Sequence, residues 1–397
     1  MRRPHRWFSA PDVSVLFGVG MAIAAVAAVR PAVSYRALDL GAGPAFVGAA
    51  AGSFALFSLF AAIPAGLLVD RFGAKPFFIA GTGTIAAAAV VDAFAAVLFV
   101  LPLGQALLGL GQLGSQLAGQ TSAARGRGGA DRDLRFGRFA VAVSIGQLVG
   151  PLAGGLILDR AEQAGMDAPT TPVFLFGAAL ALGATAVGAT SRAWAPAAGD
   201  ARADGSQARP SVSSMLRITG MRHELATSIA VLTAVDLLVA YLPLVGREHG
   251  LSPAFVGLLL SVRGLATLAS RLALPVLMAS LGRRMTLGGN LFAAGLAFAA
   301  LSVATRPAVF LALVVVIGFG LGVGQPITAS WVAGQAPADR VAAALALRLT
   351  GNRAGQLLLP AVAGLAAGLG GTTLVFGAAG LALIGSTLSV RRISLDV

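Results

Sequence analysis

Long runs without a single charged residue constrain this chain more than any other feature of its sequence. One example is LAAGLGGTTLVFGAAGLALIGSTLSV at 365–390. About 20 apolar residues in a helix cross the roughly 30 Å hydrocarbon core of a bilayer. Hydropathy and turn signals together predict twelve such helices, at 12–36, 44–69, 76–95, 97–123, 136–158, 171–191, 225–246, 253–280, 286–304, 307–334, 341–368 and 371–389. We therefore expect an all-α integral membrane protein whose first partner is the lipid bilayer.

The basic residues predict how these helices are oriented. The formal net charge is +13, with 29 Lys and Arg residues. If the chain starts inside, most of them fall in loops on that side, and the other side receives only Arg36, Arg160, Arg247 and Arg306. Loops rich in Lys and Arg stay in the cytoplasm. We expect a multi-pass protein of the cytoplasmic membrane with both termini inside, and we interpret the basic excess as a topology signal, not as a nucleic-acid surface.

An internal repeat divides the chain into two halves. The pentapeptide PAFVG occurs at 44–48 and again at 253–257, 209 positions later. The same offset relates Gly41 to Gly250, Gly73 to Gly282, and GQLVGP at 146–151 to GQLLLP at 355–360. The repeat predicts two pseudo-symmetric six-helix bundles, 1–194 and 225–397, joined by a polar cytoplasmic linker at 195–224. Parallel repeats of this kind build secondary transporters whose substrate site lies between the halves at mid-membrane.

The loop after the second predicted helix carries a family signature. The stretch GLLVDRFGAK at 66–75 resembles the G-x-x-x-D-R/K-x-G-R/K-R/K motif of the major facilitator superfamily, and it keeps Gly66, Asp70, Arg71, Gly73 and Lys75. Ala74 departs from it. We expect Gly66 to allow close helix approach and Gly73 to form a tight turn. The resemblance implies an interdomain latch; the alternative is an ordinary basic loop. The second copy, PVLMASLGRR at 275–284, lacks the acid, so the latch would be one-sided.

A second motif bears on the direction of transport. GQLVGPLAGG at 146–155 resembles the G-x-x-x-G-P-x-x-G-G pattern of the proton-coupled antiporters in this superfamily, through Gly146, Gly150, Pro151, Gly154 and Gly155. The resemblance favours export modestly; the alternative is a small-residue packing face. That branch usually has an arginine in the fourth helix where this chain has Gln105, so proton coupling through such an arginine is unsupported.

Charges inside the predicted spans point to the substrate. Asp236, Arg263 and Arg353 lie near mid-depth, where ionisable groups are costly and mark pathways or ion pairs. We expect Asp236 to pair with Arg263 or Arg353, and the remaining arginine to bind an anionic or polar substrate. Asp236 is also a candidate carrier of a coupling proton. The alternative is a closed structural ion pair.

Other polar residues are weaker candidates. Arg30, in the outer third of the first helix, lines an outer vestibule or extends to the headgroups. The amides of Gln112, Gln116 and Gln325 face the expected cavity and bind either substrate or neighbouring helices. Asp92 lies near the end of a peripheral helix, which favours a structural role.

The sequence offers little for enzyme chemistry. It has no cysteine, three histidines outside the spans, and no P-loop around its one lysine, Lys75. We expect no enzyme activity, metal or cofactor. The sequence favours a monomeric secondary transporter of a small organic molecule, anionic or neutral, working by alternating access and coupled to protons, with export favoured. The alternatives are a multidrug–proton antiporter for lipophilic compounds and an uptake symporter for organic anions.

Overall fold

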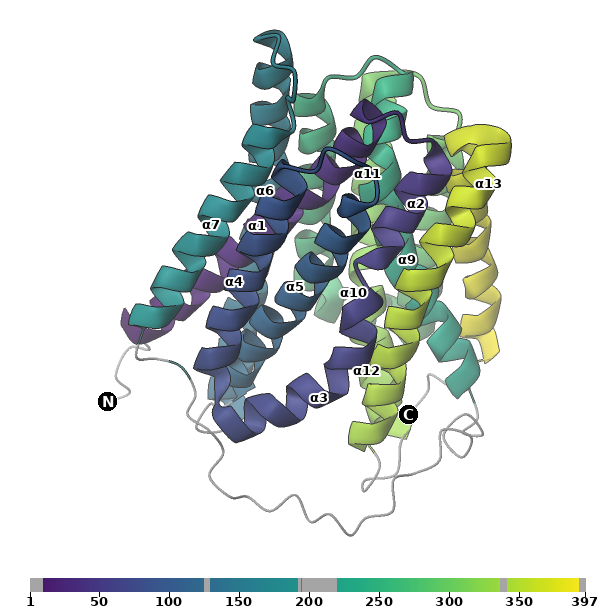
Figure 1. Ribbon diagram of the computed structural model, residues 1–397. Helices are drawn as coiled ribbons and strands as arrows, with labels where there is room; N and C mark the ends of the chain where they lie inside the picture. Colours follow the sequence, from purple (N-terminus) through teal and green to yellow (C-terminus); the bar gives the residue numbers. More distant parts are fainter. Residues whose placement is uncertain (1–9, 125–128, 192–193, 195–219, 336–340, 393–397) are drawn as a thin grey trace.

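The structure is a computed structural model, and it describes residues 10–124, 129–191, 194, 220–335 and 341–392. Within these ranges the chain is helical, with short turns between helices (Figure 1). The first half contains α1 (Ala10–Asp39), α2 (Pro44–Ser53), α3 (Leu56–Phe72), α4 (Ala74–Ala93), α5 (Val100–Ala124), α6 (Gly129–Gln163) and α7 (Thr171–Thr190). The second half contains α9 (Met221–Glu248), α10 (Pro253–Leu301), α11 (Pro307–Gly322), α12 (Gly324–Gln335) and α13 (Val341–Arg392). The all-α prediction is confirmed.

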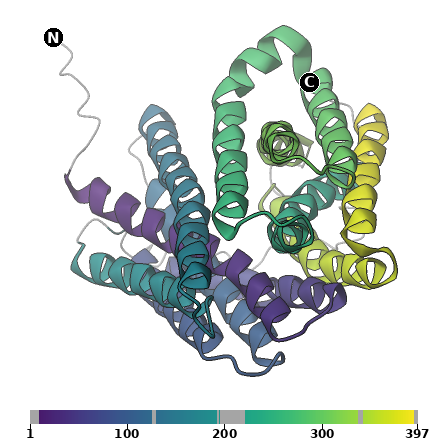
Figure 2. The ribbon, with the colours of Figure 1, turned by 90° about the horizontal axis from the view of Figure 1, so that it is seen from above.

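Two of these helices each cross the membrane twice. The 49-residue α10 breaks at Gly282, and the 52-residue α13 breaks at Gly370 and Gly371. Conversely, α2 and α3 together make one crossing, and so do α11 and α12. Each half thus provides six crossings, as the sequence predicts. Figure 2 shows the helices of the first half on one side of the molecule and those of the second half on the other.

The sequence repeat is also a repeat of backbone conformation. Gly41 and Gly250, which are 209 positions apart, have φ values of 80° and 65°. Gly73 and Gly282 have φ values of 85° and 71°. These values lie in the region that glycine adopts without steric cost. The tight turn predicted at Gly73 is present, and its partner in the second half is Gly282.

The start of the second half differs from the prediction. Helix α9 begins at Met221, so its first turn includes residues that the sequence placed in the linker. Gly220, with φ 84°, stops the helix from extending further back, and Met221 and Glu224 are buried. Residues 195–219 of the predicted linker lie outside the described residues, and the division into 1–194 and 225–397 remains a prediction.

The two halves meet closely at the end of the bundle where α1, α6 and α9 end and α2 and α10 begin, which we call the sealed end. A Cβ atom at Gly48 of α2 would lie 2.2 Å from the carbonyl oxygen of Pro360 in α13. A Cβ atom at Gly257 of α10 would lie 2.4 Å from the carbonyl oxygen of Pro151 in α6. The two glycines end the two copies of PAFVG, and the two prolines also occupy equivalent repeat positions. The repeated pentapeptide therefore supplies two symmetric contacts between the halves.

Candidate transport site between the two halves

A polar cluster joins the halves in the interior of the bundle. Arg30 of α1 donates from Nη1 to Oδ1 of Asp236 in α9 at 2.8 Å. Gln356 of α13 donates from Nε2 to Oδ2 of Asp236 at 2.6 Å, and Arg353 donates from Nη1 to Oε1 of Gln356 at 3.1 Å. Together with Arg263, these four residues form what we call the central cluster. It contains three guanidinium groups and one carboxylate.

The expected partner of Asp236 was wrong. The sequence predicted an ion pair with Arg263 or Arg353, but the carboxylate pairs with Arg30 from the other half. Helices α1 and α9 lie against each other across the interface, which brings Arg30 to Asp236 and away from any headgroup. The Arg30 guanidinium also lies over the ring of Phe54, 4.1 Å from its centroid. Such a cation–π contact helps to hold the arginine in place.

Arg263 of α10 is the arginine of the cluster that the protein leaves without a partner. It is 7% exposed, and its Nε atom is buried without a hydrogen-bond acceptor. In the part of the chain that the structure describes, no ion pair neutralises this side chain, although it lies within electrostatic range of Asp236 and Arg30. A buried charge without a counterion is costly. A bound anion would supply the missing negative charge.

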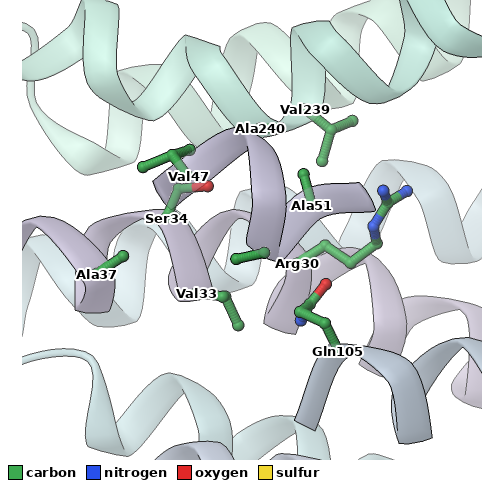
Figure 3. A pocket seen from close by; sticks show the side chains of 10 residues that line it. Arg30, Val33, Ser34, Ala37, Val47, Ala51, Gln105, Val239 and Ala240 are labelled. Carbon is green, nitrogen blue, oxygen red and sulfur yellow. The ribbon is translucent and has the colours of Figure 1, made fainter. Parts of the chain in front are cut away.

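A small pocket lies beside the Arg30–Asp236 pair. Its walls come from both halves, and Figure 3 shows Gln105 and Arg30 on one side and Val239 and Ala240 on the other. Gln105, which replaces the arginine of the antiporter branch, is 2% exposed and belongs to this wall. The fourth-helix position thus borders the interface even though its residue is uncharged.

The three glutamines named as candidates occupy different surroundings. Gln112 and Gln116 are half-buried on α5. Gln325, in α12, accepts from Nη2 of Arg348 at 2.6 Å and donates to the carbonyl oxygen of Ser228 at 3.3 Å. It belongs to a second buried group, in which Nε of Arg348 lies 3.6 Å from Oε1 of Glu224. The sequence analysis missed this pair because both residues lie close to predicted helix ends.

The latch residues are separated from the central cluster, along α3 and the start of α4. A Cβ atom at Gly66 would meet nothing within 4 Å, so the predicted close helix approach there is wrong for this conformation. Arg71 is exposed and lies 5.2 Å from the ring centroid of Phe72. Lys75 donates from Nζ to the carbonyl oxygen of Ser191 at 3.2 Å. The side chain of Asp70 lies outside the described residues, so its pairing remains a prediction.

The antiporter-type motif packs helices together. Gly146 and Gly150 face α1, where a Cβ atom would lie 2.6 Å from the Gly20 oxygen and 2.4 Å from the Ala24 oxygen. Gly154 also faces α1, next to Ala28, whereas a Cβ at Gly155 would lie 2.5 Å from the Pro253 oxygen. Pro151 lies within α6 and presents its carbonyl to α10. These contacts fit the packing alternative, and they also hold the first half against the second.

A cluster of charges at the sealed end was not anticipated. Arg247, near the end of α9, donates from Nη2 to Glu162 of α6 at 2.5 Å and to Asp39 of α1 at 3.4 Å. Its guanidinium lies 5.3 Å from the ring centroid of Tyr35. Tyr241 donates to the Pro44 carbonyl at 3.1 Å. Each bond crosses between the halves. The sequence analysis used Arg247 only as one of the few basic residues on its side.

The family model for the Major Facilitator Superfamily matches residues 15–244 and 225–394. The chain belongs to this superfamily. It is therefore a multi-pass membrane transporter of the secondary type and not an enzyme. Among curated proteins, the inner membrane transport protein YajR of Escherichia coli K12 is 30% identical over 114 residues. That match spans 28% of this chain and 25% of YajR.

Solved structures share the whole fold. The nucleoside transporter NupG superposes with a TM-score of 0.80 at 14% identity, over 97% of this chain and 100% of that chain. The peptide transporter POT in complex with sulfate has a TM-score of 0.75 at 17% identity, over 99% of this chain and 96% of that chain. At these identities the likeness concerns the fold. The twelve-helix architecture that the resemblance implied is confirmed.

Proposed function

We propose that this protein transports a small organic anion by alternating access, with protons as the coupling ion. The observation that carries the proposal is the charge balance of the central cluster. Arg30, Arg263 and Arg353 converge there on the single carboxylate of Asp236, and Arg263 has no partner among the described residues. Guanidinium groups match carboxylate and phosphate oxygens in bidentate geometry. A lipophilic cation would be repelled by this surplus of positive charge.

The described conformation fits one state of such a cycle. Arginines crowd the predicted cytoplasmic loops, which assigns the sealed end to the outer face of the cytoplasmic membrane and both termini to the inside. The outer side is then closed by the Gly48 and Gly257 contacts and by Arg247. Both walls of the pocket come from one chain, so the proposed transporter works as a monomer.

Asp236 is the proposed site of proton coupling. Its two oxygens bind Arg30 of the first half and Gln356 of the second. Protonation removes the negative charge that holds Arg30, and a substrate anion at Arg263 competes for the same guanidinium groups. Proton and substrate would therefore bias the contact between the halves in opposite ways. This arrangement suits export in exchange for protons, which the motif at 146–155 also favours.

Two other functions of the same site stay open to test. An uptake symporter for organic anions would use the same arginines with protons and substrate moving together. A multidrug–proton antiporter would use the apolar walls and treat the arginines as structural. The nucleoside and peptide transporters that share the fold carry polar solutes, which agrees better with the first two.

Thermal unfolding of the purified protein in detergent tests the substrate class. The panel contains organic anions, neutral solutes and lipophilic cations. A ligand at 100 times its Kd stabilises the folded state by about 2.7 kcal/mol. We expect anions to raise the unfolding midpoint of the wild type and of the matched control Arg271→Gln. We expect Arg263→Gln and Arg353→Gln to lose that response.

Two results would contradict the proposal. Stabilisation by lipophilic cations alone would favour the multidrug antiporter. Anion stabilisation that persists in both Arg263→Gln and Arg353→Gln would remove these residues from the site. For an anion that passes, counterflow in proteoliposomes with an imposed pH gradient gives direction and coupling. In that assay Asp236→Asn should make transport independent of the gradient.

A further inference from the structure

Asp92 is a buried carboxyl group that the proposed transport site does not use. It lies one residue before the end of α4 and is 0% exposed. Within the described residues, neither carboxyl oxygen has a hydrogen-bond donor within reach, and no basic side chain forms an ion pair with it. The polar side chain beside it is Gln105 of α5. A structural role, as predicted from its peripheral helix, does not explain why an acid occupies this position.

The neighbouring helix is shaped around this carboxyl. A Cβ atom at Gly104 would lie 1.9 Å from Oδ1 of Asp92 and 2.5 Å from its Cγ. No side chain other than hydrogen fits there while the carboxyl keeps its place. The glycine that precedes Gln105 thus makes room for Asp92, and the acid is seated in the contact between α4 and α5.

The surroundings do not neutralise a negative charge on Asp92. Arg36 of α1 uses Nε and Nη2 to bond the Ala95 carbonyl, at 3.1 and 2.7 Å. Arg30 is bound to Asp236. Helix α7, which also packs on α4, brings Thr171, which donates to the Ala93 carbonyl. Lys75 is at the opposite end of α4. An unpaired carboxylate in such a site is costly, and a carboxyl avoids that cost by keeping its proton.

Gln105 connects this carboxyl with the pocket between the halves. It lies beside Asp92 and also lines the pocket next to Arg30, as Figure 3 shows. Its Nε2 atom is buried without a partner among the described residues. When the sealed end opens, water that enters the pocket reaches Gln105 and then the carboxyl. An amide with free hydrogen-bonding capacity is suited to that position.

We propose that Asp92 is a second proton-binding site, located in the first half and reached from the pocket through Gln105. In the sealed conformation the carboxyl holds its proton. When the halves part, the proton passes to water and the carboxylate that remains is hydrated. This site goes beyond the proposed function, where coupling is assigned to Asp236. Either assignment can fail without the other.

Infrared spectroscopy of the purified protein tests the site without a substrate. A protonated carboxyl gives a carbonyl stretching band that shifts when its proton exchanges for deuterium. We expect a band near neutral pH that disappears in Asp92→Asn and persists in Asp236→Asn. We expect the band to shift slowly in D₂O in the wild type and faster in Arg247→Gln, where the sealed end is weakened.

The outcomes separate the possibilities. A spectrum that Asp92→Asn leaves unchanged would mean that the carboxyl is ionised, and would overturn the proposal. A band lost in Asp92→Asn that never shifts in D₂O, even in Arg247→Gln, would reduce Asp92 to a structural acid. If Asp92→Asn does not fold, Gln105→Leu replaces it. Loss of the neighbouring amide should move the band and slow its exchange, and an unmoved band with unchanged exchange would contradict the role of Gln105.

Discussion

At the scale of single residues, Asp236 has the most demanding environment. It accepts hydrogen bonds from Arg30 and Gln356 and is 3% exposed. Asp236→Asn would leave Arg30 buried without its counterion, a change that costs about 3–5 kcal/mol in buried ion pairs. We predict this loss in the free energy of unfolding, measured by chemical denaturation in detergent.

The same prediction has an internal control. Adding Arg30→Gln to Asp236→Asn removes the stranded charge and should restore part of the stability. The two changes should therefore be non-additive by about 0.5–3 kcal/mol. Additive losses would mean that the pair contributes little and that Phe54 and the helix packing hold Arg30.

Arg263 should respond in the opposite direction. Its guanidinium is buried without a partner among the described residues, so the ligand-free protein bears its desolvation cost. We predict that Arg263→Gln raises the stability of the ligand-free protein by about 1–3 kcal/mol while it abolishes the response to anions. Arg353→Gln, whose parent side chain is bonded to Gln356, should stabilise less. A destabilised Arg263→Gln would indicate a structural arginine.

The residue scale also marks where sequence reasoning ends. Apolar spans and helical rise located Asp236, Arg263 and Arg353 inside the membrane. They did not identify Arg30 as the partner, because the pair joins helices 206 positions apart, and depth alone does not say which helix faces which. Gln356 was visible in the repeated GQLLLP, yet its role depends on that same packing.

At the scale of elements, the backbone approach at α2 and α13 is the tightest feature of the sealed end. A side chain at Gly48 collides with the Pro360 carbonyl, so Gly48→Leu should prevent closure. The chain has no cysteine, so Ala240→Cys, which faces the pocket at 3% exposure, supplies a unique thiol. We predict that Gly48→Leu increases its labelling rate by an impermeant maleimide about tenfold or more, equivalent to at least 1.4 kcal/mol.

The matched control is Gly66→Leu on the same membrane crossing. A Cβ there meets nothing within 4 Å, so labelling of Ala240→Cys should stay at the wild-type rate. If both leucines accelerate labelling equally, general loosening of the fold explains the effect. If neither does, the sealed end opens without separating α2 from α13.

The element scale explains why one glycine was interpreted correctly and another was not. A tight turn depends on local backbone conformation, so Gly73 was predictable from its motif. Close helix approach depends on the state of the transporter, and in this state the face at Gly66 has no neighbour. The repeat predicted the symmetric crossings, but it did not indicate that the repeated glycines lie at the interface between the halves.

At the scale of the whole molecule, Arg247 links three helices from both halves at the surface. Because it is 41% exposed on its side chain, each ion pair contributes only about 0–1 kcal/mol. Arg247→Gln should therefore raise the labelling rate of Ala240→Cys by about fivefold or less. High salt should raise the rate in the wild type and change it little in Arg247→Gln, since screening acts on the same pairs. Equal salt effects in both proteins would exclude Arg247 as the source.

The two PAFVG copies test whether the sealed end closes as one unit. Gly48 meets the Pro360 carbonyl on one side of the molecule, and Gly257 meets the Pro151 carbonyl on the other. If each half moves as a rigid body, one obstructed contact already holds both apart. We predict that Gly257→Leu accelerates labelling of Ala240→Cys as much as Gly48→Leu does, and that the double variant is no faster than either. Additive effects on the logarithm of the rate would show that the two contacts open independently, because separate sites contribute free energies that sum. In that case closure would be a bending of single helices instead of a rocking of the halves.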